Sequence, residues 1–232
     1  MFIWFKFPAN KLISVQPDIT KLLFSFFRKY KLSTFESGEK IICSNNKEIF
    51  FLNSGVVRMF SKVNDSEVTL NIYKPYSLFP MSLILNDTQD KYQYDALFKA
   101  EGYFAPKDKF KKFLKNNPGI FFDLLKRIYL GLEGYFMRVE SLLLGDAYLR
   151  VLTHLVIYTR RFGKSSNDRI VFDWSMTHWQ LASQTGLARE SVTKVIRKLQ
   201  DKGLIGYLGK KLFISDPLKL EEEYLSHKKI TP

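Results

Sequence analysis

Cysteine and histidine are scarce in this chain of 232 residues. It has one cysteine, Cys43, and three histidines, His154, His178 and His227. A single cysteine excludes an internal disulfide and any iron–sulfur or multi-cysteine metal site built from one chain. We therefore expect no metal and no cofactor, and the composition fits a reducing, cytoplasmic setting.

Long apolar runs are also missing. The N-terminus is apolar, but Lys6 and Pro8 interrupt it before it reaches the length of a signal-peptide core. No later stretch approaches the roughly 18 apolar residues of a membrane-spanning helix. We expect a protein that is neither exported nor inserted in a membrane.

Acidic residues are few compared with basic ones. The chain has 36 Lys and Arg against 23 Asp and Glu, a formal net charge of +13. This balance favours a polyanionic partner, and nucleic acid is the first candidate. The basic residues are spread over both halves of the chain, so the net charge does not locate the site. The length exceeds that of a usual single domain, so two domains are expected.

The first half of the chain is rich in short β-type runs. Residues 18–32 predict a short amphipathic helix that covers the domain that follows. From Thr34 to about Ala105, turn residues separate five apolar runs: Lys40–Cys43, Glu48–Leu52, Val56–Lys62, Val68–Tyr73 and Tyr94–Lys99. This spacing predicts a small antiparallel barrel or jelly roll. Residues 34–105 contain no histidine, which argues against a metal-dependent barrel enzyme of the cupin type. We expect no enzymatic activity.

A long helical segment follows a short predicted helix at 106–113. It begins after Asn116-Asn117-Pro118 and runs to about Leu144. Seven of its apolar residues are spaced 4, 3, 4, 3, 4, 3, which is a heptad seam: Phe121, Leu125, Ile128, Leu132, Tyr135, Val139 and Leu142. Such a seam predicts pairing with a second copy of the helix. The alternative is that the seam packs on its own barrel, because further apolar residues flank it. Gly145-Asp146 then breaks the helix, and Asp146 can cap the next one.

The C-terminal part has the pattern of a winged helix–turn–helix. Thr177 and Gln180 form a capping box at the start of a short helix that ends at Gly186. The next helix buries Val192, Val195, Ile196 and Leu199 and begins at about Arg189. Its outer face offers four side chains for reading base edges: Arg189, Glu190, Ser191 and Lys194.

A predicted β-hairpin follows this helix and has a basic tip at Gly209-Lys210-Lys211. Four side chains are predicted to contact DNA phosphate: Thr177, Arg197, Lys210 and Lys211. The alternative is an ordinary amphipathic helix hairpin with a solvated charged face. The order of strand, capped short helix, glycine turn, basic helix and basic-tipped hairpin favours DNA binding.

These residues resemble the catabolite-activator/Fnr (Crp/Fnr) family of bacterial regulators. The similarity extends over nearly the whole chain and is strongest at 176–214, in Leu181-Ala182, Gly186-Leu187, Arg189-Glu190-Ser191-Val192, Lys194 and Ile196. The resemblance implies an α+β protein with a β-roll (jelly-roll, cyclic-nucleotide-binding-like) sensor domain, a long dimerisation helix and a C-terminal winged helix–turn–helix. We place these parts at 1–116, 117–144 and 145–232. The resemblance also implies a homodimer on a twofold double-stranded DNA operator, with RNA polymerase as a further candidate partner.

The sensor segment departs from the family members that bind cyclic nucleotides. Pro80 and Met81 stand where those members carry Gly and Glu, and no arginine occurs between Arg58 and Arg127 to clamp a phosphate. We therefore expect an effector that is not a cyclic nucleotide. Candidate residues for a pocket that takes a small organic effector are Tyr76, Phe79, Ser82, Tyr94 and Tyr135. These aromatics could equally be core, and the alternative function is a constitutive, weakly sequence-specific nucleic-acid-binding protein with a degenerate barrel.

Overall fold

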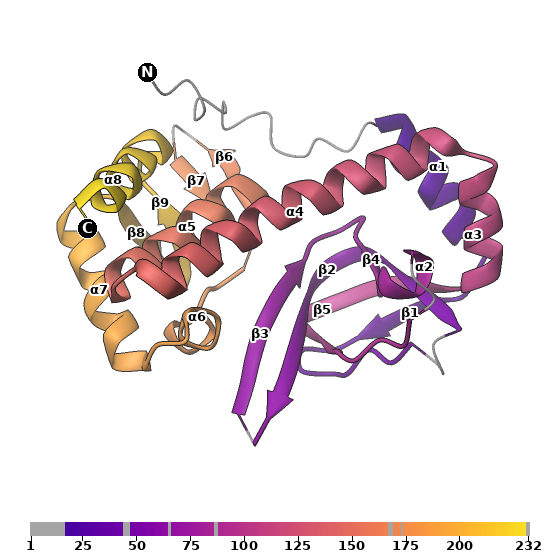
Figure 1. Ribbon diagram of the computed structural model, residues 1–232, viewed down its shortest axis with the longest axis horizontal. Helices are drawn as coiled ribbons and strands as arrows, with labels where there is room; N and C mark the ends of the chain where they lie inside the picture. Colours follow the sequence, from indigo (N-terminus) through magenta and orange to yellow (C-terminus); the bar gives the residue numbers. More distant parts are fainter. Residues whose placement is uncertain are drawn as a thin grey trace. The chain divides into compact units, whose positions relative to one another are not determined.

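The computed structural model describes residues 17–43, 47–64, 66–85, 88–166, 169–172 and 174–230. It forms two compact units, whose described parts are residues 17–127 and 128–230. Helix α4 (Pro118–Leu144) belongs to both, and the elements of each unit are labelled in Figure 1. In the described part of the chain, every helix is too short or too polar to cross a membrane.

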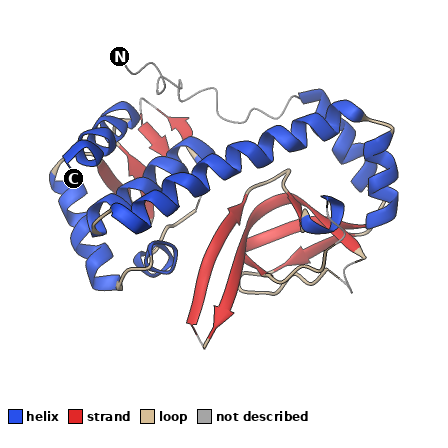
Figure 2. Ribbon diagram, viewed as in Figure 1, coloured by secondary structure: helices blue, strands red, loops and turns tan. Residues whose placement is uncertain are grey.

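The first unit is built on an antiparallel sheet (Figure 2). Its strand order is β1 (Leu32–Phe35), β5 (Gln93–Pro106), β2 (Glu48–Val63) and β3 (Ser66–Tyr73), and β4 (Leu78–Phe79) pairs with β2. In the described part of this unit, three helices accompany the sheet: α1 (Pro17–Phe27), α2 (Ser82–Leu85) and α3 (Lys107–Lys115). The predicted β-rich sensor fold is confirmed.

Aromatic rings fill the core of this unit. Phe27 of α1 stacks on Phe51 of β2 with 4.7 Å between ring centroids, and both side chains are fully buried. Helix α1 therefore covers the sheet through its apolar face, as its sequence pattern predicts.

Three local predictions for this unit are wrong. The predicted helix over 18–32 ends at Phe27, because Leu32–Phe35 pair with β5 instead. The predicted strand Lys40–Cys43 is reduced to a single bridge between Lys40 and Asp95. Cys43 consequently lies outside a strand, where burial raises the pKa of its thiol to about 12.

The runs Glu48–Leu52 and Val56–Lys62 are one strand rather than two. Gly55 does not end a strand; it lies at register shifts between β2 and β5. Its φ is +88°, and an added Cβ would lie 2.2 Å from the Lys99 carbonyl oxygen. Glycine is needed there because the two backbones approach closely at a bulge.

The second unit contains the end of α4, four further helices and a second sheet. The helices are α5 (Ala147–Phe162), α6 (His178–Thr185), α7 (Arg189–Asp201) and α8 (Pro217–Ile230). The sheet has the order β6 (Lys164–Ser166), β7 (Arg169–Val171), β9 (Lys211–Ile214) and β8 (Ile205–Leu208). Helix α5 is buried along most of its length, and Asp146 caps it by accepting a hydrogen bond of 2.8 Å from the Leu149 backbone N–H. The predicted cap and C-terminal helix–turn–helix are confirmed.

Candidate nucleic-acid interface

The turn between α6 and α7 follows directly from the local sequence. The Gln180 backbone N–H donates to Thr177 Oγ1 at 3.1 Å, and the Gln180 side chain accepts from the Thr177 backbone N–H at 2.9 Å. Gly186 ends α6 with a φ of +64°, which glycine adopts without strain. The predicted capping box and glycine turn are confirmed, and they set the direction in which α7 begins.

Helix α7 has a buried face and a polar face. The buried face is that expected, because Val192, Val195, Ile196 and Leu199 are all buried. On the other face Arg189, Glu190 and Lys194 are exposed and Ser191 is half-buried. Ala188 stands at the N-cap and provides no side-chain hydrogen bond to the first turn.

Two lysines near the end of α7 are exposed but also contact the body of the unit. Lys198 Nζ lies 4.4 Å from the centre of the Tyr148 ring, and Lys202 forms an ion pair with Glu223 of α8. These contacts hold the C-terminal half of α7 against α5 and α8. The exposed basic side chains of α7 are Arg189, Lys194, Arg197 and Lys198, and Lys198 is the one that also contacts Tyr148.

The predicted phosphate contacts have different local settings. Lys210 and Lys211 are exposed at the turn between β8 and β9, where Gly209 has a φ of +61°. Arg197 is exposed on α7, whereas the hydroxyl of Thr177 already serves as the cap of α6. Backbone amides at the start of α6 can supplement Thr177 in contacting an anion.

His178 was missed by sequence reasoning. Its Nδ1 lies 2.8 Å from Thr193 Oγ1 of α7, and its Nε2 lies 3.3 Å from the Tyr207 hydroxyl of β8. Burial and the positive charge of Arg189 both lower its pKa. Its place directly after the cap Thr177, next to the predicted DNA face, was the signal that could have indicated it.

The predicted dimerisation seam is largely exposed in the single chain. Its members other than Tyr135 have exposed fractions of 37–50%: Phe121, Leu125, Ile128, Leu132, Val139 and Leu142. A neighbouring stripe is even more exposed, at 60–77%: Phe122, Tyr129, Phe136 and Leu143. Exposed apolar residues repeated along one helix in this way are typical of a surface that contacts a partner.

The predicted effector residues have different local settings. Phe79 and Tyr94 are buried and stack with 4.6 Å between ring centroids. Tyr76 is exposed on the turn before β4, and Ser82 begins α2. Tyr135 belongs to the second unit, where Arg138 lies over its ring. Among the described residues, no group of three His, Cys, Asp or Glu side chains could hold a metal ion.

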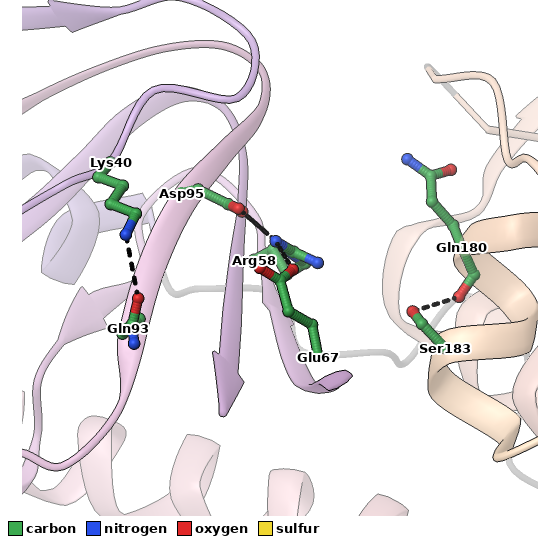
Figure 3. Close-up of polar contacts among 7 residues, drawn as sticks. All are labelled: Lys40, Arg58, Glu67, Gln93, Asp95, Gln180 and Ser183. Carbon is green, nitrogen blue, oxygen red and sulfur yellow. Dashed lines mark hydrogen bonds and ion pairs between the residues drawn. The ribbon is translucent and has the colours of Figure 1, made fainter. Parts of the chain in front are cut away.

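The two arginines that bound the arginine-free stretch of the sequence, Arg58 and Arg127, are already paired with carboxylates. Arg58 Nε donates to Asp95 at 2.9 Å and its Nη2 bonds Glu67 at 2.9 Å, as Figure 3 shows. Burial lowers the pKa of Arg58, but the bonds to Asp95 and Glu67 outweigh it and raise the pKa overall. Arg127 pairs with Asp123 and donates to the Tyr76 carbonyl oxygen at 3.2 Å.

Two domain families match the chain in the order that the fold suggests. The cyclic nucleotide-binding domain matches residues 32–117, and the Crp-like helix-turn-helix domain matches residues 149–223. The global nitrogen regulator of Nostoc sp. is 26% identical over 199 residues, which cover 83% of this chain and 89% of that protein. The anaerobic regulatory protein of Bacillus subtilis is 24% identical over 82% of this chain and 81% of its own length.

Solved structures share the fold at low sequence identity. A CooA mutant from Carboxydothermus hydrogenoformans gives a TM-score of 0.71 at 18% identity, covering 86% of this chain and 90% of that one. A CRP/FNR-family transcriptional regulator from Thermus thermophilus gives 0.65 at 22% identity, covering 85% and 100%. Because both domain types and the regulators that resemble the chain agree, this chain belongs to the Crp/Fnr family of DNA-binding transcription regulators.

Proposed function

We propose that the protein acts as a homodimer that reads a twofold DNA operator through the polar face of α7. The observation that carries this proposal is the exposure of Arg189, Glu190 and Lys194 opposite a fully apolar buried face of the same helix. Arginine can bond guanine O6 and N7 together, and glutamate can accept from cytosine N4. Ser191 and Lys194 complete the base-reading set.

Phosphate contacts orient α7 on the duplex. Lys210 and Lys211 at the hairpin tip, Arg197 on α7 and Thr177 at the start of α6 supply them in this proposal. These contacts carry no sequence information, because every nucleotide offers the same phosphate. They determine affinity and its dependence on salt.

Dimerisation through α4 sets the spacing of the two readers. The exposed heptad seam from Phe121 to Leu142 supports pairing of two α4 helices. A twofold dimer of this kind places its half-sites about 34 Å apart, one turn of the double helix. RNA polymerase is a further proposed partner of the DNA-bound dimer.

The proposed effector of the sensor unit is a small molecule other than a cyclic nucleotide. A cyclic phosphate needs an uncommitted arginine, whereas Arg58 and Arg127 are held by Asp95, Glu67 and Asp123. Pro80 and Met81 also stand where the cyclic-nucleotide binders carry Gly and Glu.

The test compares two alanine variants on a selected duplex and on random duplex. Arg189→Ala is expected to weaken binding to the selected site by about 1–3 kcal/mol and to leave random DNA nearly unchanged. Lys210→Ala is expected to weaken both duplexes alike and to lower the salt slope by about one. Equal losses on both duplexes for Arg189→Ala would instead favour a constitutive, weakly specific binder.

A further inference from the structure

We infer that His178 is a positioning residue of the DNA reader, because one directed chain of hydrogen bonds through its ring links β8 to the first turn of α7. The inference rests on the proposed role of α7 in reading bases. His178 is the first residue of α6, so these hydrogen bonds join α6, α7 and β8.

The direction of the chain follows from the hydroxyl of Thr193. Thr193 Oγ1 donates its one hydrogen to the Arg189 carbonyl oxygen at 2.9 Å. It must therefore accept in its 2.8 Å contact with His178, which places a hydrogen on Nδ1.

The other ring nitrogen then acts as the acceptor. Burial and Arg189 both lower the pKa of His178, so the ring is neutral at neutral pH. A neutral ring with hydrogen on Nδ1 leaves a lone pair on Nε2, and the Tyr207 hydroxyl at 3.3 Å donates to it. The hydrogen-bond chain runs from the Tyr207 hydroxyl through His178 and Thr193 to the carbonyl of Arg189.

The hydrogen-bond chain ends at Arg189, the first base-reading residue of α7 in the proposed function. The first turn of α7 lacks a capping side chain, since Ala188 stands at the N-cap. Thr193, one turn further along α7, bonds that turn, and His178 of α6 bonds Thr193. Tyr207 links the hairpin that carries Lys210 to the same imidazole ring. Bidentate base contacts tolerate little displacement, so loss of the chain reduces sequence preference rather than general affinity.

The first experiment uses the DNA-free protein and therefore does not depend on the proposed function. Long-range ¹H–¹⁵N spectra, with the His178 signals assigned by their loss in His178→Phe, report which ring nitrogen carries hydrogen. We expect the Nδ1–H form for His178, and a shift toward the Nε2–H form in Thr193→Val. A wild-type His178 that is mainly Nε2–H overturns the inference.

The second experiment measures binding to a selected site and to random duplex. His178→Phe and Tyr207→Phe are each expected to reduce the preference for the selected site about fivefold, the typical contribution of one hydrogen bond. The double variant should lose no more than His178→Phe alone, because both substitutions break the same chain. Tyr73→Phe is the matched control: it removes a tyrosine hydroxyl that contacts Met59 Sδ in the first unit, and it should leave the preference unchanged.

Two results would overturn the inference. Losses that add in the double variant would show that His178 and Tyr207 act separately, and equal losses on random duplex would make His178 a phosphate contact only. If wild-type protein selects no site at all, the proposed function of α7 fails, while the tautomer of His178 still decides whether the hydrogen-bond chain exists.

Discussion

Leu132 lies in the middle of the apolar seam of α4, and its side chain is 41% exposed in the single chain. Full burial of a leucine contributes about 1.5–3 kcal/mol, so covering the exposed two fifths adds about 0.6–1.2 kcal/mol per chain. A twofold dimer contains the residue twice, which gives about 1.2–2.4 kcal/mol. Leu132→Ala should therefore weaken dimerisation about eightfold to sixtyfold, and Leu132→Glu, which also brings two carboxylates together, should weaken it further.

Sedimentation equilibrium over a range of concentrations measures this effect directly. Glu133→Ala is the matched control, because Glu133 is the exposed neighbour on the same helix and lies off the seam. We expect the control to dimerise as the wild type does, and Leu132→Glu to bind a single half-site with no benefit from the second. An unchanged dimerisation constant in Leu132→Glu would refute the assignment of the seam to the dimer interface.

Two further predictions concern stability. Burial lowers the pKa of His154 from 6.5 to about 4, so its stabilising contribution is present above pH 6.5 and is lost as the pH falls toward 4. The free energy of unfolding should decrease by about 3 kcal/mol over this window, and chemical denaturation of His154→Leu should show a smaller decrease; an identical pH slope would contradict the account. Asp95→Asn removes the carboxylate of a buried ion pair with Arg58, whose exposed fraction is 7%. The substitution should lower the free energy of unfolding, measured with urea, by about 3 kcal/mol. Glu39→Gln, an exposed carboxylate in the same unit, should cost far less, and equal costs would argue against a buried pair.

The features that the sequence predicted well depend on neighbours close in the chain. The capping box joins Thr177 to Gln180, and Gly186 needs only its own positive φ. The buried face of α7 follows from helical spacing alone. For these features local chemistry and the final fold agree.

The features that were missed depend on partners far along the chain. The predicted helix over 18–32 is too long because Leu32 belongs to a strand, Leu32–Phe35, and this strand is recognised only through its pairing with Ala100–Tyr103. Gly55 suggests a turn in the sequence. Only the pairing of β2 with β5 shows that Gly55 lies at a bulge within one strand. His178 becomes informative through Thr193 and Tyr207, which are 15 and 29 residues away.

The central claim is that the face of α7 led by Arg189 reads base sequence. Selection from a random duplex pool, carried out in parallel with wild-type protein and Arg189→Ala, tests it most directly. The account predicts a twofold motif with half-sites about 34 Å apart for the wild type, and the same motif with one relaxed base position for the variant. Recovery of no twofold motif by the wild type, or of an identical motif by Arg189→Ala, would contradict it.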